Sequence, residues 1–105
     1  PNKNSYFNYD YQASVGTDSY FSYIRSIVKD KHGQLWIGTD GGGISCVNKQ
    51  WQRVKHFSVE DKNSISHNNI KSLCYDEEND KLYVGMYLGG FNCIDVKTGT
   101  VKKYF

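Results

Sequence analysis

The chain has 105 residues, a formal net charge of +2 and a mean hydropathy of −0.67, a length that suits one small domain. Its charges are scattered, whereas nucleic-acid binders usually carry a basic stripe, and no run approaches the ~20 apolar residues of a spanning helix. We therefore expect neither nucleic acid nor a membrane to be bound by this segment. Aromatic residues make up 15% of the chain, and ten glycines accompany a single proline, a balance that favours β-strands joined by turns.

The first half of the chain predicts four short strands. Apolar and β-branched runs place them at Ile24–Lys29, 35–37, Ile44–Val47 and Arg53–Phe57. Asp30 and Gly33 begin and end a segment typical of a type I turn, and Gly42-Gly43 precedes the third strand, where a positive φ is expected. The second strand, 35–37, is apolar at consecutive positions, which is typical of a strand covered on both faces.

The second half predicts four more strands. They fall at Ile70–Tyr75, 82–84, Phe91–Ile94 and Val101–Phe105. The acidic run 76–80 is expected to be a solvated hairpin tip, with Asn79 at the position that tolerates a positive φ. Gly99 suits the last hairpin loop.

The two halves are copies of one repeat. Residues 35–39 return as 82–86, 42–48 as 89–95, and 54–57 as 101–104, all at an offset of 47. Residues 24–27 return as 70–73 at an offset of 46, so the second copy has one extra residue in its first turn. A four-stranded repeat of this length predicts an all-β fold of about two antiparallel β-propeller blades, an incomplete propeller.

The repeat resembles the two-component regulator propeller repeat. The residues that carry the resemblance are Ile24, Ser26, Ile27, Asp30, Gly33, Leu35, Trp36, Ile37, Gly38, Thr39, Gly42 and Gly43. The second copy departs from the pattern with Tyr83 in place of Trp, Met86 in place of Thr, and Leu88 before its glycine pair. The resemblance implies the periplasmic sensor region of a hybrid two-component system histidine kinase, an inner-membrane protein whose kinase and receiver parts lie outside this chain. Such a sensor detects a glycan-type signal and is not itself an enzyme.

These observations divide the chain into three parts. Residues 1–23 are expected to be the end of a preceding blade and its connecting loop, 24–69 the first blade repeat with an inter-blade loop, and 70–105 the second repeat. Propellers need about 4–8 blades, so two blades leave apolar faces uncovered. We therefore expect partners at these faces, either neighbouring blades of a longer protein or further copies of the chain that self-associate through them.

No residue pattern indicates catalysis, a metal site or a cofactor. His32, His56 and His67 fall in a turn, an outer strand and a connecting loop, without the spacing of metal ligands. The glycine run 41–43 lacks the Lys and Ser/Thr of a phosphate-binding loop. The three cysteines, at 46, 74 and 93, show no zinc-site spacing and are expected to be small buried apolar residues.

Ligands of propellers commonly bind at one rim, where the connecting loops meet. The candidate ligand-binding residues in those loops are Asp40, Tyr87, His67 and Asn68. An oligosaccharide is the ligand that the family resemblance implies. For His67 and Asn68, hydrogen bonding within the loop is the favoured role.

Two other functions remain open. A propeller enzyme similar to streptogramin lyases would need a catalytic histidine beside an acid, usually with a divalent ion, and only His67 is placed on an axial loop. A protein-interaction scaffold would instead bind partners through exposed strand edges.

Overall fold

The computed structural model of the chain describes residues 23–60, 64–88 and 90–104. Within these ranges the chain forms eight strands: β1 (Ile24–Lys29), β2 (Leu35–Thr39), β3 (Ile44–Val47), β4 (Arg53–Phe57), β5 (Ile70–Asp76), β6 (Lys81–Met86), β7 (Phe91–Asp95) and β8 (Val101–Tyr104). They pair as two antiparallel sheets with strand orders β1-β2-β3-β4 and β5-β6-β7-β8, here named blade 1 and blade 2. The predicted all-β fold of two four-stranded blades is confirmed.

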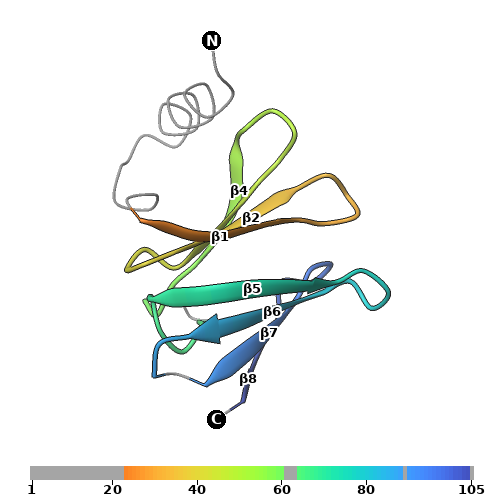
Figure 1. Cartoon of the computed structure of the whole chain (residues 1–105). Helices are drawn as coiled ribbons and strands as arrows, with labels where there is room; N and C mark the ends of the chain where they lie inside the picture. The colour runs from red at the N-terminus through yellow and green to blue at the C-terminus, as the bar shows by residue number, and fades with distance from the viewer. Residues whose placement is uncertain (1–22, 61–63, 89, 105) are drawn as a thin grey trace.

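The two blades lie against each other along their first strands. Figure 1 shows β1 and β5 side by side, with β4 and β8 on the far sides of the pair. Within the part of the chain that the structure describes, the two sheets do not close into a ring, as expected for an incomplete propeller. The expected end of a preceding blade, in residues 1–22, lies outside the described residues.

The main core fills the space between the blades, which we call the seam. The front face of blade 1 is its side toward blade 2, and it contributes Trp36, Ile44, Cys46 and Phe57. The back face of blade 2 is its side toward blade 1, and it contributes Leu73, Leu82, Val84 and Ile94. Burying each large apolar side chain stabilises the fold by about 1.5–3 kcal/mol, so the seam joins the two repeats into one unit.

Strand β2 is covered on both faces, as its sequence predicted. Trp36 packs in the seam, whereas the next residue, Ile37, packs on the opposite face with Val47 and Trp51. The backbone of β2 also approaches blade 2 closely at Gly38. A Cβ atom there would lie 2.6 Å from Cγ2 of Ile70, so glycine is needed for this approach.

The turns follow the sequence with one exception. Gly43 has φ +77°, and any side chain at this position would collide with the backbone carbonyl of Phe57. In the acidic turn of blade 2 the prediction for Asn79 was wrong, because the left-handed residue is Asp80, with φ +54°. The extra residue of this turn moves the left-handed position one place along, directly before β6.

The loop that joins the blades is fixed to both of them. Ile65 is buried in the seam core, and Asn92 on the back face of blade 2 accepts from the Ser66 amide (2.9 Å) and donates to the Ser66 hydroxyl (3.0 Å).

Among the described residues there is no helix long and apolar enough to cross a bilayer.

Candidate functional site

All four candidate residues meet at one rim of the blade pair. The amides of Gly41 and Gly43 donate to the carbonyl of Asn68 at 3.1 and 3.0 Å. On the other side of the same loop, the amide of Tyr87 donates to the carbonyl of Asn69 at 3.1 Å, and Asn69 forms a β-bridge with Asp40. The inter-blade loop is therefore held between the β2–β3 loop of blade 1 and the β6–β7 loop of blade 2.

Tyr87 presents a half-exposed aromatic ring at this rim. The His67 ring packs against it in a T-shaped arrangement, with centroids 6.3 Å apart and planes at 75°. The Lys71 ammonium group lies 5.2 Å from the centroid of the Tyr87 ring, within the range of a cation–π interaction. These contacts orient the ring while leaving about half of the side chain open to solvent, a combination suited to stacking on a flat ligand surface.

Asp40 brings a carboxylate to the same rim. Its Oδ2 lies 3.8 Å from a guanidinium nitrogen of Arg25, and both side chains are more than 40% exposed. The Asp40 backbone is fixed by its amide, which donates to the carbonyl of Tyr23 at 2.8 Å. An exposed ion pair of this kind stabilises the fold by only about 0–1 kcal/mol, so both charged groups remain available to a ligand with hydroxyl groups.

His67 and Asn68 hydrogen-bond within the loop. Nδ1 of His67 accepts from the Asn69 amide at 3.0 Å, and Oδ1 of Asn68 accepts from the Val59 amide at 2.9 Å. These bonds shape the loop that positions Tyr87 and Asp40.

Among the described residues there is no group of three His, Cys, Asp or Glu side chains arranged to hold a metal ion.

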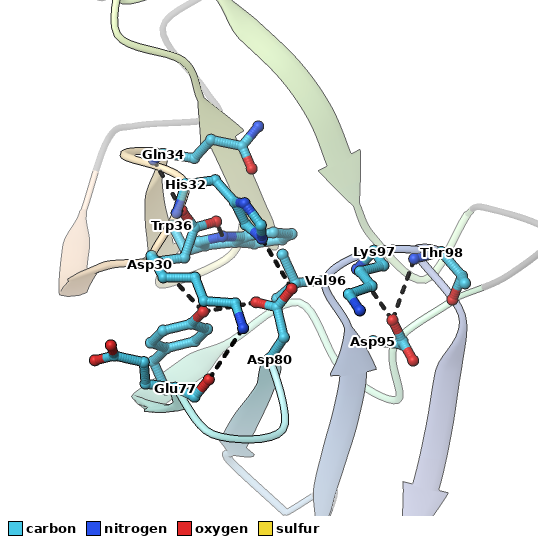
Figure 2. Close-up of polar contacts among 12 residues, drawn as sticks. Asp30, His32, Gln34, Trp36, Glu77, Asp80, Asp95, Val96, Lys97 and Thr98 are labelled. Carbon is cyan, nitrogen blue, oxygen red and sulfur yellow. Dashed lines mark hydrogen bonds and ion pairs between the residues drawn. The ribbon is translucent and has the colours of Figure 1, made fainter.

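A second polar cluster lies in the seam, at the opposite end of the strands. Asp80 is buried, and its carboxylate accepts from Nε2 of His32 at 2.8 Å and from the Tyr75 hydroxyl at 2.6 Å (Figure 2). The Tyr75 hydroxyl in turn accepts from the Lys31 amide at 3.2 Å. The expectation of a solvated acidic tip was therefore wrong for Asp80, because blade 1 covers it.

Asp30 organises the blade 1 side of this cluster. One carboxylate oxygen accepts from the amides of His32 and Gln34, both at 2.9 Å, and the other accepts from Nε1 of Trp36 at 2.8 Å. Asp30 thus closes the β1–β2 turn and fixes the indole ring that fills the seam. Asp30 and Trp36 both belong to the repeat pattern seen in the sequence.

The protonation of Asp80 is set by this environment. Burial opposes ionisation, but the hydrogen bonds from His32 and Tyr75 and the charges of His32 and Lys31 outweigh burial and hold the pKa of Asp80 below its ordinary value. Burial, followed by the bond to Asp80, raises the pKa of Tyr75. The cluster therefore combines an ionised carboxylate with a protonated phenol that bonds to it.

The cysteines differ in their exposure. Cys46 and Cys93 are buried, as expected, but Cys74 is exposed, so that prediction was wrong. Burial, followed by the nearby charge of Asp30, raises the pKa of Cys46 to about 12. Cys74 is exposed because it lies on the side of blade 2 that faces away from blade 1.

An open groove lies beside the His32–Asp80 contact. Its volume is about 490 Å³, and the side chains that line it are His32, Gln34, Asn48, Lys49, Gln50, Val96 and Lys97. The groove was not found by sequence reasoning, because its walls come from three turns of two different repeats. It lies at the opposite end of the strands from Tyr87, so it is separate from the rim described above.

Comparison with known proteins identifies the repeat. The family model described as two component regulator propeller matches residues 21–41. Comparison with curated proteins finds no match. The solved structures that match are much longer, and the chain spans only 10–13% of their length.

Three of these structures show what the chain resembles. An extracellular domain assigned to the hybrid two component system BT4673 of B. thetaiotaomicron is 31% identical over 85% of this chain and 13% of its own, with a TM-score of 0.73. A second such domain, from BT3049 of the same organism, is 25% identical over 79% of this chain and 11% of its own, with a TM-score of 0.67. PorZ, a surface component of the type-IX secretion system of Porphyromonas gingivalis, is 30% identical over 72% and 10%, with a TM-score of 0.66. Residues 21–41 thus match the two component regulator propeller repeat, and the two-blade β-propeller segment resembles the extracellular domains of hybrid two component systems.

Proposed function

We propose that the chain is part of the periplasmic sensor propeller of a hybrid two component system histidine kinase, and that its rim contributes to the recognition of an oligosaccharide without catalysing a reaction. The resemblance to extracellular domains of such systems supports the sensor assignment. The rim that joins Asp40, Tyr87, His67 and Asn68 supports the binding role.

The observation that carries the proposal is the exposed ring of Tyr87, held from one side by His67 and approached by the Lys71 ammonium group. Sugar rings have apolar C–H faces that stack on aromatic rings, and hydroxyl groups that bond to charged side chains at the edge of the ring. Asp40 and Arg25 offer an acceptor and a donor at the same rim. Aromatic stacking with adjacent charged groups is therefore the chemistry that this surface provides.

The position of the rim also links binding to the arrangement of the blades. Asp40 belongs to blade 1 and Tyr87 to blade 2, and both are joined through Asn69 of the inter-blade loop. A ligand that contacts both loops binds best to one relative position of the two blades. Binding of such a ligand shifts the equilibrium toward that blade arrangement. The size of the shift is set by the difference between the affinities of the ligand for the two arrangements.

An NMR titration of ¹⁵N-labelled chain tests the proposal, with cellohexaose as a neutral probe and hexagalacturonate as an acidic one. We expect amide shifts confined to 40–43, 67–69 and 87, and recovery of the hexasaccharide intact at the end. Tyr87→Ala should abolish these shifts, whereas Tyr83→Ala, which removes another exposed tyrosine that makes none of the rim contacts, should not.

Two results would contradict the proposal. Shifts that persist in Tyr87→Ala, or that centre on the groove of His32, Lys49 and Lys97, would exclude the rim as the binding site. Shortened probe in the recovered sample would contradict the non-enzymatic role.

A further inference from the structure

Each blade places a basic residue of its first strand beside the loop that follows its second strand. In blade 1 this residue is Arg25, whose guanidinium group lies 3.8 Å from the Asp40 carboxylate. In blade 2 the counterpart of Arg25 is Lys71, and the counterpart of Asp40 is Tyr87. The Lys71 ammonium group lies over the Tyr87 ring, 5.2 Å from its centroid. The two blades therefore repeat one contact at the rim, with an aromatic ring in blade 2 where blade 1 has a carboxylate.

This position of the repeat stays open to solvent when a neighbouring blade is present. Blade 2 follows blade 1, and the side chains of Arg25 and Asp40 remain 47% and 41% exposed beside it. Blade 1 precedes blade 2, and Lys71 and Tyr87 remain exposed beside it. Because the blades are copies of one repeat, neither the preceding nor the following blade is expected to cover this position.

The ring in blade 2 leaves the charge of Lys71 without an acidic partner. Among the described residues, no carboxylate lies within ion-pair distance of the Lys71 ammonium group. Glu60 of the inter-blade loop lies toward the outer strand β4, where hydrogen bonds, led by that from Ser58, and the charge of His56 lower its pKa. The uncompensated positive charge of the rim therefore lies on β5, beside the exposed ring.

Blade 1 shows which group completes this contact. There the basic side chain faces a carboxylate, with which a charged donor forms strong hydrogen bonds. A ligand that stacks on Tyr87 can bring such a group to Lys71 if a carboxylate is attached to its ring, as in a uronic acid. A cation–π contact at an exposed site is weaker than a charge-assisted hydrogen bond. The ammonium group then exchanges the ring face for the carboxylate and leaves that face to the sugar.

We propose that the rim selects oligosaccharides of uronic acids over neutral ones, with Lys71 binding the carboxylate and Tyr87 stacking on the sugar ring. The proposal rests on the oligosaccharide role of the rim and names the class of sugar within it. The ligand carboxylate takes the place that the Asp40 carboxylate has in blade 1. Arg25 contributes less than Lys71, because Asp40 already compensates its charge.

Two probes with the same sugar chain and different charge test the proposal: hexagalacturonate, and the same hexasaccharide with every carboxyl group methyl-esterified. NMR titration of the ¹⁵N-labelled chain gives the dissociation constant of each probe from the amides of 67–69 and 87. We expect the acid to bind about tenfold more tightly than the ester at low salt, because it adds a hydrogen bond between charged groups. The ratio should fall as sodium chloride screens the charges.

Variants of single charges identify the residue responsible. Lys71→Met keeps an unbranched side chain without the charge and should abolish the preference for the acid, whereas Lys71→Arg should retain it. Lys29→Met, the matched control, removes an exposed lysine at the other end of β1 and should leave the preference unchanged. Asp40→Asn should increase the preference, because it removes a repelling carboxylate and frees Arg25.

The outcomes separate this proposal from the binding role of the rim. Equal affinity for acid and ester at the rim would overturn the preference for uronic acids and leave the oligosaccharide role in place. A preference that survives in Lys71→Met would also overturn it, because another residue then binds the carboxylate. Absence of shifts at 40–43, 67–69 and 87 with both probes would overturn the binding role of the rim, and this proposal with it.

Discussion

Nε2 of His32 in blade 1 lies 2.8 Å from Oδ2 of Asp80 in blade 2, so a charge-assisted hydrogen bond crosses the seam. Asp80 is buried and His32 is about half exposed, so the bond lies where the seam meets solvent. The carboxylate also accepts from Tyr75 of its own blade. Asp80 therefore ties the turn of blade 1 to the back face of blade 2.

Replacing the Asp80 carboxylate should weaken this connection. We expect Asp80→Asn to lower the free energy of unfolding by about 1–3 kcal/mol at pH 7, because an amide replaces a buried charged acceptor. Asparagine tolerates the positive φ of this position, so the backbone should be retained. Urea unfolding measures the change, and Glu78→Gln in the same turn is the matched exposed control, expected to change little.

The effect of Asp80 should depend on pH. Its pKa is lowered in the folded chain, so its ionisation favours folding above the ordinary aspartate pKa of about 3.9 and loses that contribution as pH falls through the folded-state pKa. The difference between the original chain and Asp80→Asn should therefore shrink below about pH 4. A difference that stays constant from pH 7 to pH 3 would contradict the role of the charge.

Gly38 should be far less tolerant of substitution than Gly85. In Gly38→Ala the new Cβ would lie 2.6 Å from Cγ2 of Ile70, so the blades must separate, and we expect a loss of about 1–3 kcal/mol. In Gly85→Ala the new Cβ would meet only Ser72, whose hydroxyl can rotate away, so the loss should be clearly smaller. Thermal unfolding of both variants makes the comparison, and equal losses would contradict the seam geometry.

Trp36→Tyr tests the polar side of the indole. The change gives blade 1 the residue that blade 2 has at the equivalent position, Tyr83. It removes the Nε1 donor to buried Asp30 and leaves space in the seam, so we expect a loss of about 2–4 kcal/mol. Denaturant unfolding followed by circular dichroism measures it. A neutral result would mean that the indole neither bonds to Asp30 nor fills the seam.

The thiols should react in a fixed order. Under dilute native conditions at pH 8, we expect Ellman's reagent to modify Cys74 and to leave Cys46 unmodified, because Cys46 is buried and its pKa is raised to about 12. All three cysteines should react in denaturant. A Cys74→Ser variant identifies the fast site, and rapid native labelling that survives in this variant would contradict the assignment.

Much of the fold was predictable because the sequence contains the same four-stranded repeat twice. Offsets of 46 for the first strand and 47 for the other three align the two blades, and the consecutive apolar residues 35–37 correctly indicated a strand covered on both faces. The rim was predictable in outline, since loops at one end of a blade pair must lie together. Asn69, which joins Asp40 to Tyr87, was missed because its contribution comes from the backbone.

The remaining features depend on contacts between repeats. Asp80 reads as part of a solvated acidic run, and its partner His32 lies 48 residues earlier, in a turn that has one residue fewer. Nothing in the local sequence distinguishes it from Glu77 or Glu78. Cys74 looks like a buried residue of a strand. Its counterpart in blade 1, Val28, packs against the seam core, whereas Cys74 lies on the opposite side of blade 2 and is exposed.

The packing of blade 1 on blade 2 through Gly38 and Ile70 underlies the whole account, and NMR cross-relaxation measures it most directly. We predict a strong nuclear Overhauser effect between the α protons of Gly38 and the γ2 methyl group of Ile70 in the dilute chain. Absence of that effect, in a sample that shows the expected β1–β2 and β5–β6 contacts, would mean that the blades fold but do not stack as described.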